Sequence, residues 1–129
     1  MTLEQKVKIF KALSDETRLR ILNLLIEKEC CVCEVMQALN ISQTRASRNL
    51  SALYNAGFLI LRREGLWSLY SIDENKIDPF AASILRALRL HIKDNPLLAR
   101  DIENLKKAVR ENRLCPDDPC CSSGINEHA

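Results

Sequence analysis

The sequence contains no apolar run long enough to form a membrane-spanning helix, and only three glycines and four prolines occur among its 129 residues. Scarce glycine and proline favour long helices over a turn-rich all-β fold. The first ten residues do not place a basic segment before an apolar one, so the pattern of a secretory signal is missing. We therefore expect a cytoplasmic protein without a membrane partner, built mainly from helices around one modest core.

A strong charge of either sign is also missing, because the formal net charge is only +2 at pH 7. The distribution is nevertheless uneven, since residues 42–63 contain no acid but four arginines, namely Arg45, Arg48, Arg62 and Arg63. A local basic segment in near-neutral surroundings can complement a phosphate backbone. Six cysteines in a reducing compartment indicate free thiols or metal ligands rather than a disulfide framework.

Apolar periodicity and capping residues predict the order of the elements. Six helices are expected. The first three lie at 3–13, from a cap at 14 or 15 to 28, and within 30–39. The other three lie at 43–55, from a cap at 78 with proline at 79, and after 95–96 to about Arg113. Two apolar runs, 58–61 and 67–72, flank a Glu-Gly turn and predict a β-hairpin. This order predicts a mainly helical, dimeric winged helix-turn-helix fold.

The predicted helix at 43–55 has the composition of a DNA recognition helix. Ser42 is a suitable N-cap, and Ala46, Leu50 and Leu53 form the stripe expected to be buried. Polar and basic residues then lie on the exposed face, where they can contact bases or phosphates. The candidate DNA-binding residues are Ser42, Gln43, Thr44, Arg45, Ser47 and Arg48 on this helix, with Arg62 and Arg63 of the hairpin on flanking phosphates.

Several stretches together resemble the ArsR/SmtB family of metal-sensing winged-helix repressors. They are Leu13–Leu22, Ile41–Leu50 with Leu53, Ala56–Leu59, and Arg62–Gly65 with Tyr70. The resemblance implies a homodimer, built from the first helix and the C-terminal helices, that binds a palindromic double-stranded operator. The chain departs from the family where Leu66 replaces a basic wing residue and where Asn49 replaces a common histidine.

Three cysteines lie close together at Cys30, Cys31 and Cys33, and the segment around them resembles the metal-binding motif of arsenic-, cadmium- and lead-responsive members. Cys31 and Cys33 match that motif; Met36 stands where many arsenic sensors have a third cysteine, and Cys30 is extra. Thiolates select soft ions, and trivalent arsenic or antimony takes three sulfurs in a pyramid. In a helix, Cys30 and Cys33 would share a face, whereas Cys31 and Cys33 would stand about 200° apart. We therefore expect binding to unwind the first turn.

The C-terminal end adds three further thiols, Cys115, Cys120 and Cys121, among prolines, serines and acids. We divide the chain into a DNA-binding and dimerisation domain at 1–113 and a cysteine-rich tail at 114–129. The tail thiols are candidates for a second three-sulfur site, for a third ligand to Cys31 and Cys33, or for incidental cysteines. Which cysteine group forms the inducer site stays open.

The predicted function is a repressor released from DNA by As(III) or Sb(III). Two alternatives use the same fold: a sensor of Cd(II), Pb(II) or Zn(II), with four sulfurs drawn from both cysteine groups, or a thiol-redox switch. An enzyme with reactive cysteines is disfavoured, because the Cys30–Cys33 spacing follows no predicted strand and the sequence shows neither a βαβ pattern nor a phosphate loop.

Overall fold

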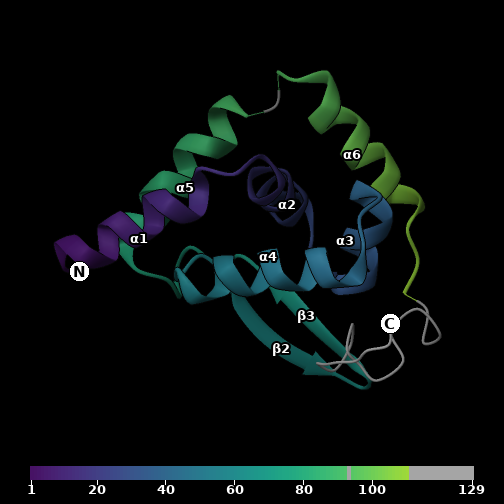
Figure 1. Cartoon of the computed structure of the whole chain (residues 1–129), viewed down its shortest axis with the longest axis horizontal. Coiled ribbons are helices and arrows are strands. Elements are labelled where there is room, and N and C mark those ends of the chain that lie inside the picture. Colours follow the sequence, from purple (N-terminus) through teal and green to yellow (C-terminus); the bar gives the residue numbers. More distant parts are fainter. Residues whose placement is uncertain (93, 111–129) are drawn as a thin grey trace.

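A computed structural model describes residues 1–92 and 94–110 of the chain. In chain order its elements are α1 (Leu3–Leu13), α2 (Glu16–Glu27), β1 (Cys30–Cys31), α3 (Val32–Leu39), α4 (Gln43–Asn55), β2 (Ile60–Glu64), β3 (Trp67–Ser71), α5 (Pro79–His91) and α6 (Pro96–Lys107). All six expected helices and the hairpin are present. The fold is the predicted winged helix-turn-helix, with α3 and α4 as its helix pair and β2–β3 as its wing (Figure 1).

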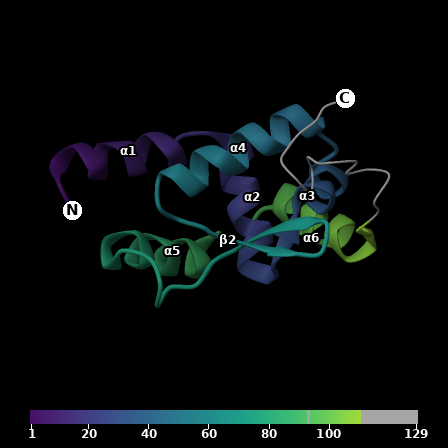
Figure 2. The ribbon, with the colours of Figure 1, turned by 90° about the horizontal axis from the view of Figure 1, so that it is seen from below.

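Helix α2 forms the centre of the molecule, with α1 and α5 to one side and α3 and α6 to the other (Figure 1). It contacts α1, α3, α4, α6 and β3, and its Ile21, Leu22 and Leu24 are completely buried. In Figure 1, α4 and the strands of the wing lie below α2, and Figure 2, seen from below, shows α4 and β2 on the side of the molecule that faces the viewer. The apolar stripe of the recognition helix packs against the core, which leaves the opposite face of the helix exposed.

The helix starts follow the capping residues that the sequence predicted. Thr2 and Gln5 form a capping box, Asp15 accepts a hydrogen bond from the Arg18 backbone N–H, and Pro79 begins α5 after its Asp78 cap. In the part of the chain that the structure describes, each helix is too short or too polar to span a bilayer.

The sheet has one more strand than the predicted hairpin. Its order is β1-β3-β2, all antiparallel, with Cys30 opposite Tyr70 and Cys31 opposite Leu69. The turn between β2 and β3 places Gly65 at a φ of +61°, a value that glycine adopts at little cost. The cysteine segment therefore belongs to the wing sheet as well as to the start of α3, which the sequence analysis did not foresee.

The C-terminal helix is shorter than expected. We predicted that it would reach about Arg113, but α6 ends at Lys107, and Ala108 has extended backbone angles. The Gln37 side chain of α3 replaces the helical hydrogen bonds of Val109, since its amide donates to the Val109 carbonyl at 2.7 Å and accepts from the Val109 N–H at 3.1 Å. Tertiary contact with α3 thus ends the helix.

Candidate thiol site and DNA-binding surface

The recognition helix α4 has the predicted inward and outward faces. The Ser42 side chain accepts the Arg45 backbone N–H at 3.1 Å, and the stripe residues Ala46, Leu50 and Leu53 are fully buried. Ser42, Thr44, Arg45 and Arg48 are exposed, while Gln43 and Ser47 are half-buried. The first turns of α4 therefore present a polar, positively charged surface of the kind that contacts DNA.

The two arginines of α4 have different environments. The Arg45 guanidinium turns back to α2, where it donates to the Thr17 hydroxyl at 2.8 Å. Asn49 also faces the core helices, since its side-chain oxygen accepts from Arg18 at 3.1 Å. Arg48 is exposed and makes no hydrogen bond or ion pair within residues 1–92 and 94–110. Of the two, Arg48 is the one available to a ligand without breaking an existing contact.

The wing arginines differ in the same way. Arg62 forms a two-pronged ion pair with Glu29, at 2.7 and 2.8 Å, and a third contact with Glu64 at 2.8 Å. The hydrogen bonding of the Arg62 guanidinium to the Glu29 carboxylate is the largest cause of the raised pKa of Arg62. Arg63 is exposed, and the described residues offer it no polar partner. Arg63 is free for a phosphate, whereas Arg62 would have to leave Glu29.

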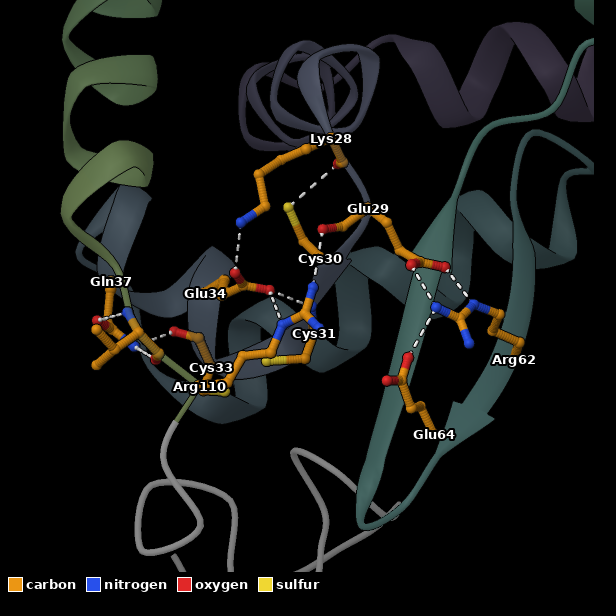
Figure 3. Close-up of polar contacts among 11 residues, drawn as sticks. Lys28, Glu29, Cys30, Cys31, Cys33, Glu34, Gln37, Arg62, Glu64 and Arg110 are labelled. Carbon is orange, nitrogen blue, oxygen red and sulfur yellow. Dashed lines mark hydrogen bonds and ion pairs between the residues drawn. The ribbon is translucent and has the colours of Figure 1, made fainter.

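The structure brings Cys31 and Cys33 together. Cys31 is the N-cap of α3 with extended backbone angles, and Cys33 lies in the first turn of the helix. Their sulfurs are adjacent in Figure 3 and share a hydrogen bond. That bond, followed by burial, raises the pKa of Cys31. Our expectation that these thiols would face apart was wrong, because it assumed that both lie within a regular helix. We call Cys31 and Cys33 the thiol pair.

Cys30 does not join the thiol pair. It lies in β1, and adjacent side chains of a strand point to opposite faces. Its buried thiol donates to the Lys28 carbonyl at 3.4 Å and points away from Cys31 in Figure 3, and burial is the main cause of its raised pKa. The predicted helix face shared by Cys30 and Cys33 is thus absent, because the chain at Cys30 is extended.

A buried carboxylate borders the thiol pair. Glu34 accepts hydrogen bonds from the Cys31 backbone N–H, from Lys28 and from Arg110, each at 2.9 Å (Figure 3). Burial acts to raise the pKa of Glu34, but these hydrogen bonds outweigh it and the pKa is lowered. Sequence analysis missed this cluster because Arg110 is 76 residues away in the chain. The only sequence signal was the capping-box position of Glu34 relative to Cys31.

Two sulfurs alone do not complete the predicted ligand set. Within residues 1–92 and 94–110, no group of three His, Cys, Asp or Glu side chains is arranged to hold a metal ion. Cys115, Cys120 and Cys121, the other predicted ligands, lie outside the described residues. The described part of the site therefore offers a soft, two-sulfur site beside a charged cluster, and a three-coordinate centre would need one ligand more.

The fold, its exposed recognition helix and its wing define a winged helix-turn-helix DNA-binding protein. Residues 15–60 match the model of the bacterial regulatory proteins of the arsR family. The arsenic resistance transcriptional regulator ArsR2 of Pseudomonas putida is 36% identical over 111 residues, which cover 83% of this chain and 95% of that protein. The chain belongs to the ArsR family, whose members regulate transcription rather than catalyse reactions, in agreement with the sequence analysis.

Other relatives are named for resistance to arsenicals or to cadmium. The arsenical resistance operon repressor of Escherichia coli is 42% identical over 61% of this chain and 68% of its own length. A CadC homolog of Staphylococcus aureus, a cadmium resistance regulatory protein, is 42% identical over 54% of this chain and 59% of its own. The predicted membership of the family is thus confirmed. The names of these two relatives differ in the element, since one refers to arsenic and the other to cadmium.

A solved structure supports the architecture. The homodimeric winged helix-turn-helix DNA-binding domain from Mycobacterium bovis, described as a possible ArsR-family transcriptional regulator, matches with a TM-score of 0.60 and 31% identity. The match covers 73% of this chain and 83% of that one. The predicted fold class is thereby confirmed.

Proposed function

We propose that this protein is a metalloid-responsive repressor that binds operator DNA as a homodimer and leaves it when As(III) or Sb(III) bonds to its cysteine sulfurs. The observation that carries the proposal is the thiol pair, two buried and adjacent sulfurs at the junction between the wing sheet and α3. Soft sulfur donors favour soft inducers. The similarity to regulators named for arsenic resistance supports the same inducer class.

Dimerisation is supported by an apolar surface on α1. The exposed side chains at helical spacing on α1 are Leu3, Val7 and Phe10, and α5 exposes Leu90. Leu3 and Leu90 are 79% and 78% exposed, so covering them would remove apolar area from water. A second copy that covers α1 and α5 would bury them and would set the spacing between two recognition helices.

Two routes connect the thiol pair to the DNA-binding surface. Cys31 is paired with Leu69 in β3, so a displacement of Cys31 is transmitted to the wing through the sheet. Helix α3 packs against α4, so a displacement of Cys33 acts on the recognition helix. Moving these elements by a small amount in both protomers changes their fit to successive grooves. A coupling free energy of about 1–3 kcal/mol is enough for an allosteric release of this kind.

The charge of the product favours the metalloid over a divalent cation. Arsenic bonded to three sulfurs is neutral, so it leaves the balance among Glu34, Lys28 and Arg110 unchanged. Cd(II) with three or four thiolates carries negative charge, which is costly at a buried site. The second candidate, a Cd(II)-, Pb(II)- or Zn(II)-responsive repressor, is favoured by the similarity to the CadC homolog.

The test is fluorescence anisotropy of the reduced full chain on labelled DNA from its own promoter, titrated with arsenite, antimonite, Cd(II), Zn(II) and peroxide. We expect arsenite or antimonite to release the DNA at near-stoichiometric levels. The double variant C31S/C33S should bind the DNA and ignore both metalloids. Cys30→Ser is the matched control, because it removes a buried thiol that faces away from the thiol pair, and it should respond like the parent protein.

The other outcomes distinguish the alternatives. Release by Cd(II) but not by arsenite would replace the proposal with the divalent-metal sensor. Release by peroxide alone would identify a redox switch. An arsenite response that survives in C31S/C33S would remove the thiol pair from the mechanism.

A further inference from the structure

Two lysines of α1 have no role in the function described so far. Lys8 and Lys11 are exposed, and neither side chain makes a hydrogen bond or an ion pair within residues 1–92 and 94–110. Glu4 lies one turn before Lys8, but in the described part of the chain it forms no ion pair with either lysine. Ammonium groups without an acidic partner are available to an anion such as a phosphate.

These lysines lie beside the recognition helix. One hollow on the surface is shared by the end of α1, the start of α2 and the C-terminal half of α4. It is lined by Lys8, Lys11, Ala12, Arg18, Ala52, Asn55 and Ala56, and none of these described lining residues is acidic. Figure 2 shows α1 and α4 in one row. The two helices therefore present a common, positively charged surface.

The end of α1 is fixed relative to α4 by the side chain of Arg18. Its guanidinium donates to the Ala12 carbonyl at 2.7 Å and to the Lys11 carbonyl at 3.4 Å. The same group donates to the side-chain oxygen of Asn49, in α4, at 3.1 Å. Because one side chain joins both helices, these bonds define the position of Lys11 relative to the recognition helix.

The exposed face of α4 leads to the same hollow. Arg48 and Asn55 are both exposed and lie seven residues apart, so they share one side of the helix. Residues 42–63, which include all of α4, contain no acid. A DNA backbone that follows this face of α4 from Arg48 to Asn55 therefore meets the α1 lysines next, without passing a carboxylate of α4.

The lysines stay open in the proposed dimer. Leu3, Val7 and Phe10 form the apolar side of α1 that a second copy would cover. At 3.6 residues per turn, Lys8 and Lys11 lie roughly 100° around the helix from that side. Since α1 belongs to the proposed interface, the two lysines lie on the side of α4 that faces the partner, between the two recognition helices.

We propose that Lys8 and Lys11 bind the DNA backbone between the two half-sites of the operator, as a phosphate-contacting surface in addition to α4 and the wing. This inference rests on the proposed function, because it requires DNA binding by a homodimer. Contacts of this kind raise the affinity for any sequence and orient the protein on the duplex, but they do not read bases.

Fluorescence anisotropy of the full chain on labelled promoter DNA tests this surface with the double variant K8Q/K11Q. We expect binding to weaken on the order of tenfold at about 0.15 M salt, and the salt slope to fall by about 1 for each lost phosphate contact. K106Q/K107Q is the matched control. It removes the same charge from exposed positions on α6, which packs on α2 and α3, and it should bind DNA like the parent.

DNA with a neutral backbone segment locates the contact. Hydroxyl-radical footprinting of the parent marks the two half-sites, and methylphosphonates then replace the phosphates between them. The parent should bind this DNA on the order of tenfold more weakly than unmodified DNA. K8Q/K11Q should bind both DNAs alike, because it has already lost the contact that the modification removes.

The other results would overturn the inference. Equal affinities and salt slopes of K8Q/K11Q and K106Q/K107Q would do so, and the proposed function would stand as long as the parent binds DNA and responds to arsenite. Loss of the dimer in K8Q/K11Q, measured by sedimentation velocity, would place the lysines in the interface instead. If the parent itself does not bind promoter DNA, the proposed function fails together with this inference.

Discussion

The arginines of the recognition surface and those around α6 have opposite environments. Arg48 and Arg63 are exposed and lack polar partners among the described residues. Arg20 and Arg110, in contrast, are bonded to the buried carboxylates of Asp101 and Glu34. The first pair can exchange water for phosphate without losing a protein contact. The second pair holds distant segments together. If either arginine moved away, a buried carboxylate would lose its charged partner.

Under the proposed function, this contrast separates the part of the domain that would bind DNA from the part that would bind the inducer. The recognition helix packs against the core through its apolar stripe, and Arg48 on its exposed face stays available to DNA. We call the thiol pair, together with Glu34 and its partners Lys28 and Arg110, the thiol end. These polar contacts join α3 to the segments that follow α2 and α6, so a change at Cys31 would reach several elements at once. Arg62 stands between the two regions, because it belongs to the wing but is bonded to Glu29, next to the cysteine segment.

The largest effect should come from Glu34. Replacing it by alanine leaves the Arg110 guanidinium and the Cys31 backbone N–H without their buried acceptor, and we expect a loss of about 3 kcal/mol in the free energy of unfolding. Urea denaturation measures this change. Glu27→Ala is the matched control, since Glu27 is exposed and has no polar side-chain partner among the described residues. Equal stabilities of the two variants would mean that the cluster does not hold the thiol end together.

Lowering the pH should also reduce the contribution of Glu34 to the free energy of unfolding, with a smaller effect than the substitution. The pKa of Glu34 is lowered in the folded protein, so the unfolded chain takes up the proton first as the pH falls. The stabilisation is complete above the ordinary glutamate pKa and is lost as the pH drops through the lowered one. Between about pH 5 and pH 3, the parent should therefore lose more stability than Glu34→Gln. Parallel curves from denaturation at each pH would contradict this assignment.

Local patterns in the sequence predicted what depends on neighbours along the chain. Ser42 and the stripe of Ala46, Leu50 and Leu53 fixed the start and the orientation of α4, and both are confirmed. The cysteine segment was predicted less well, because Cys30 and Cys31 are drawn into a strand by pairing with residues 69 and 70. Helical periodicity contains no information on such a pairing.

The polar contacts around the thiol end could not be predicted from the sequence, because they also join residues far apart in the chain. Gln37 and Val109 are 72 residues apart, and Arg20 and Asp101 are 81 apart. A buried ion pair is defined by which segments fold against each other, and single-residue patterns do not encode it. The candidate ligands were therefore identified by type, while their grouping into Cys31 with Cys33, without Cys30, required the structure.

At the DNA-binding surface, Arg48→Ala should weaken operator binding by about 1–3 kcal/mol while leaving the unfolding free energy unchanged. Anisotropy at several salt concentrations distinguishes a phosphate contact, which lowers the salt slope by about 1, from a base contact, which relaxes sequence preference. Arg45→Ala is the comparison variant, because its bond to Thr17 predicts a stability loss of about 1 kcal/mol. If Arg45→Ala weakened DNA binding more than Arg48→Ala, the assignment of the free arginine would be wrong.

The smallest effect is expected where the two regions meet. Glu29→Gln removes the carboxylate that holds Arg62, so the guanidinium becomes available to a flanking phosphate and the wing gains positive potential. DNA binding should tighten by less than about fivefold, with a steeper salt dependence, because the ion pair is exposed and screened by salt. Glu64→Gln removes the other partner of Arg62 but leaves the cysteine segment untouched, which makes it the control. If only Glu29→Gln also alters the arsenite concentration needed for release, then Glu29 connects the thiol end to the wing. If both variants shift DNA binding equally and leave the arsenite response unchanged, the two regions communicate through the β1–β3 pairing and the α3–α4 contact alone.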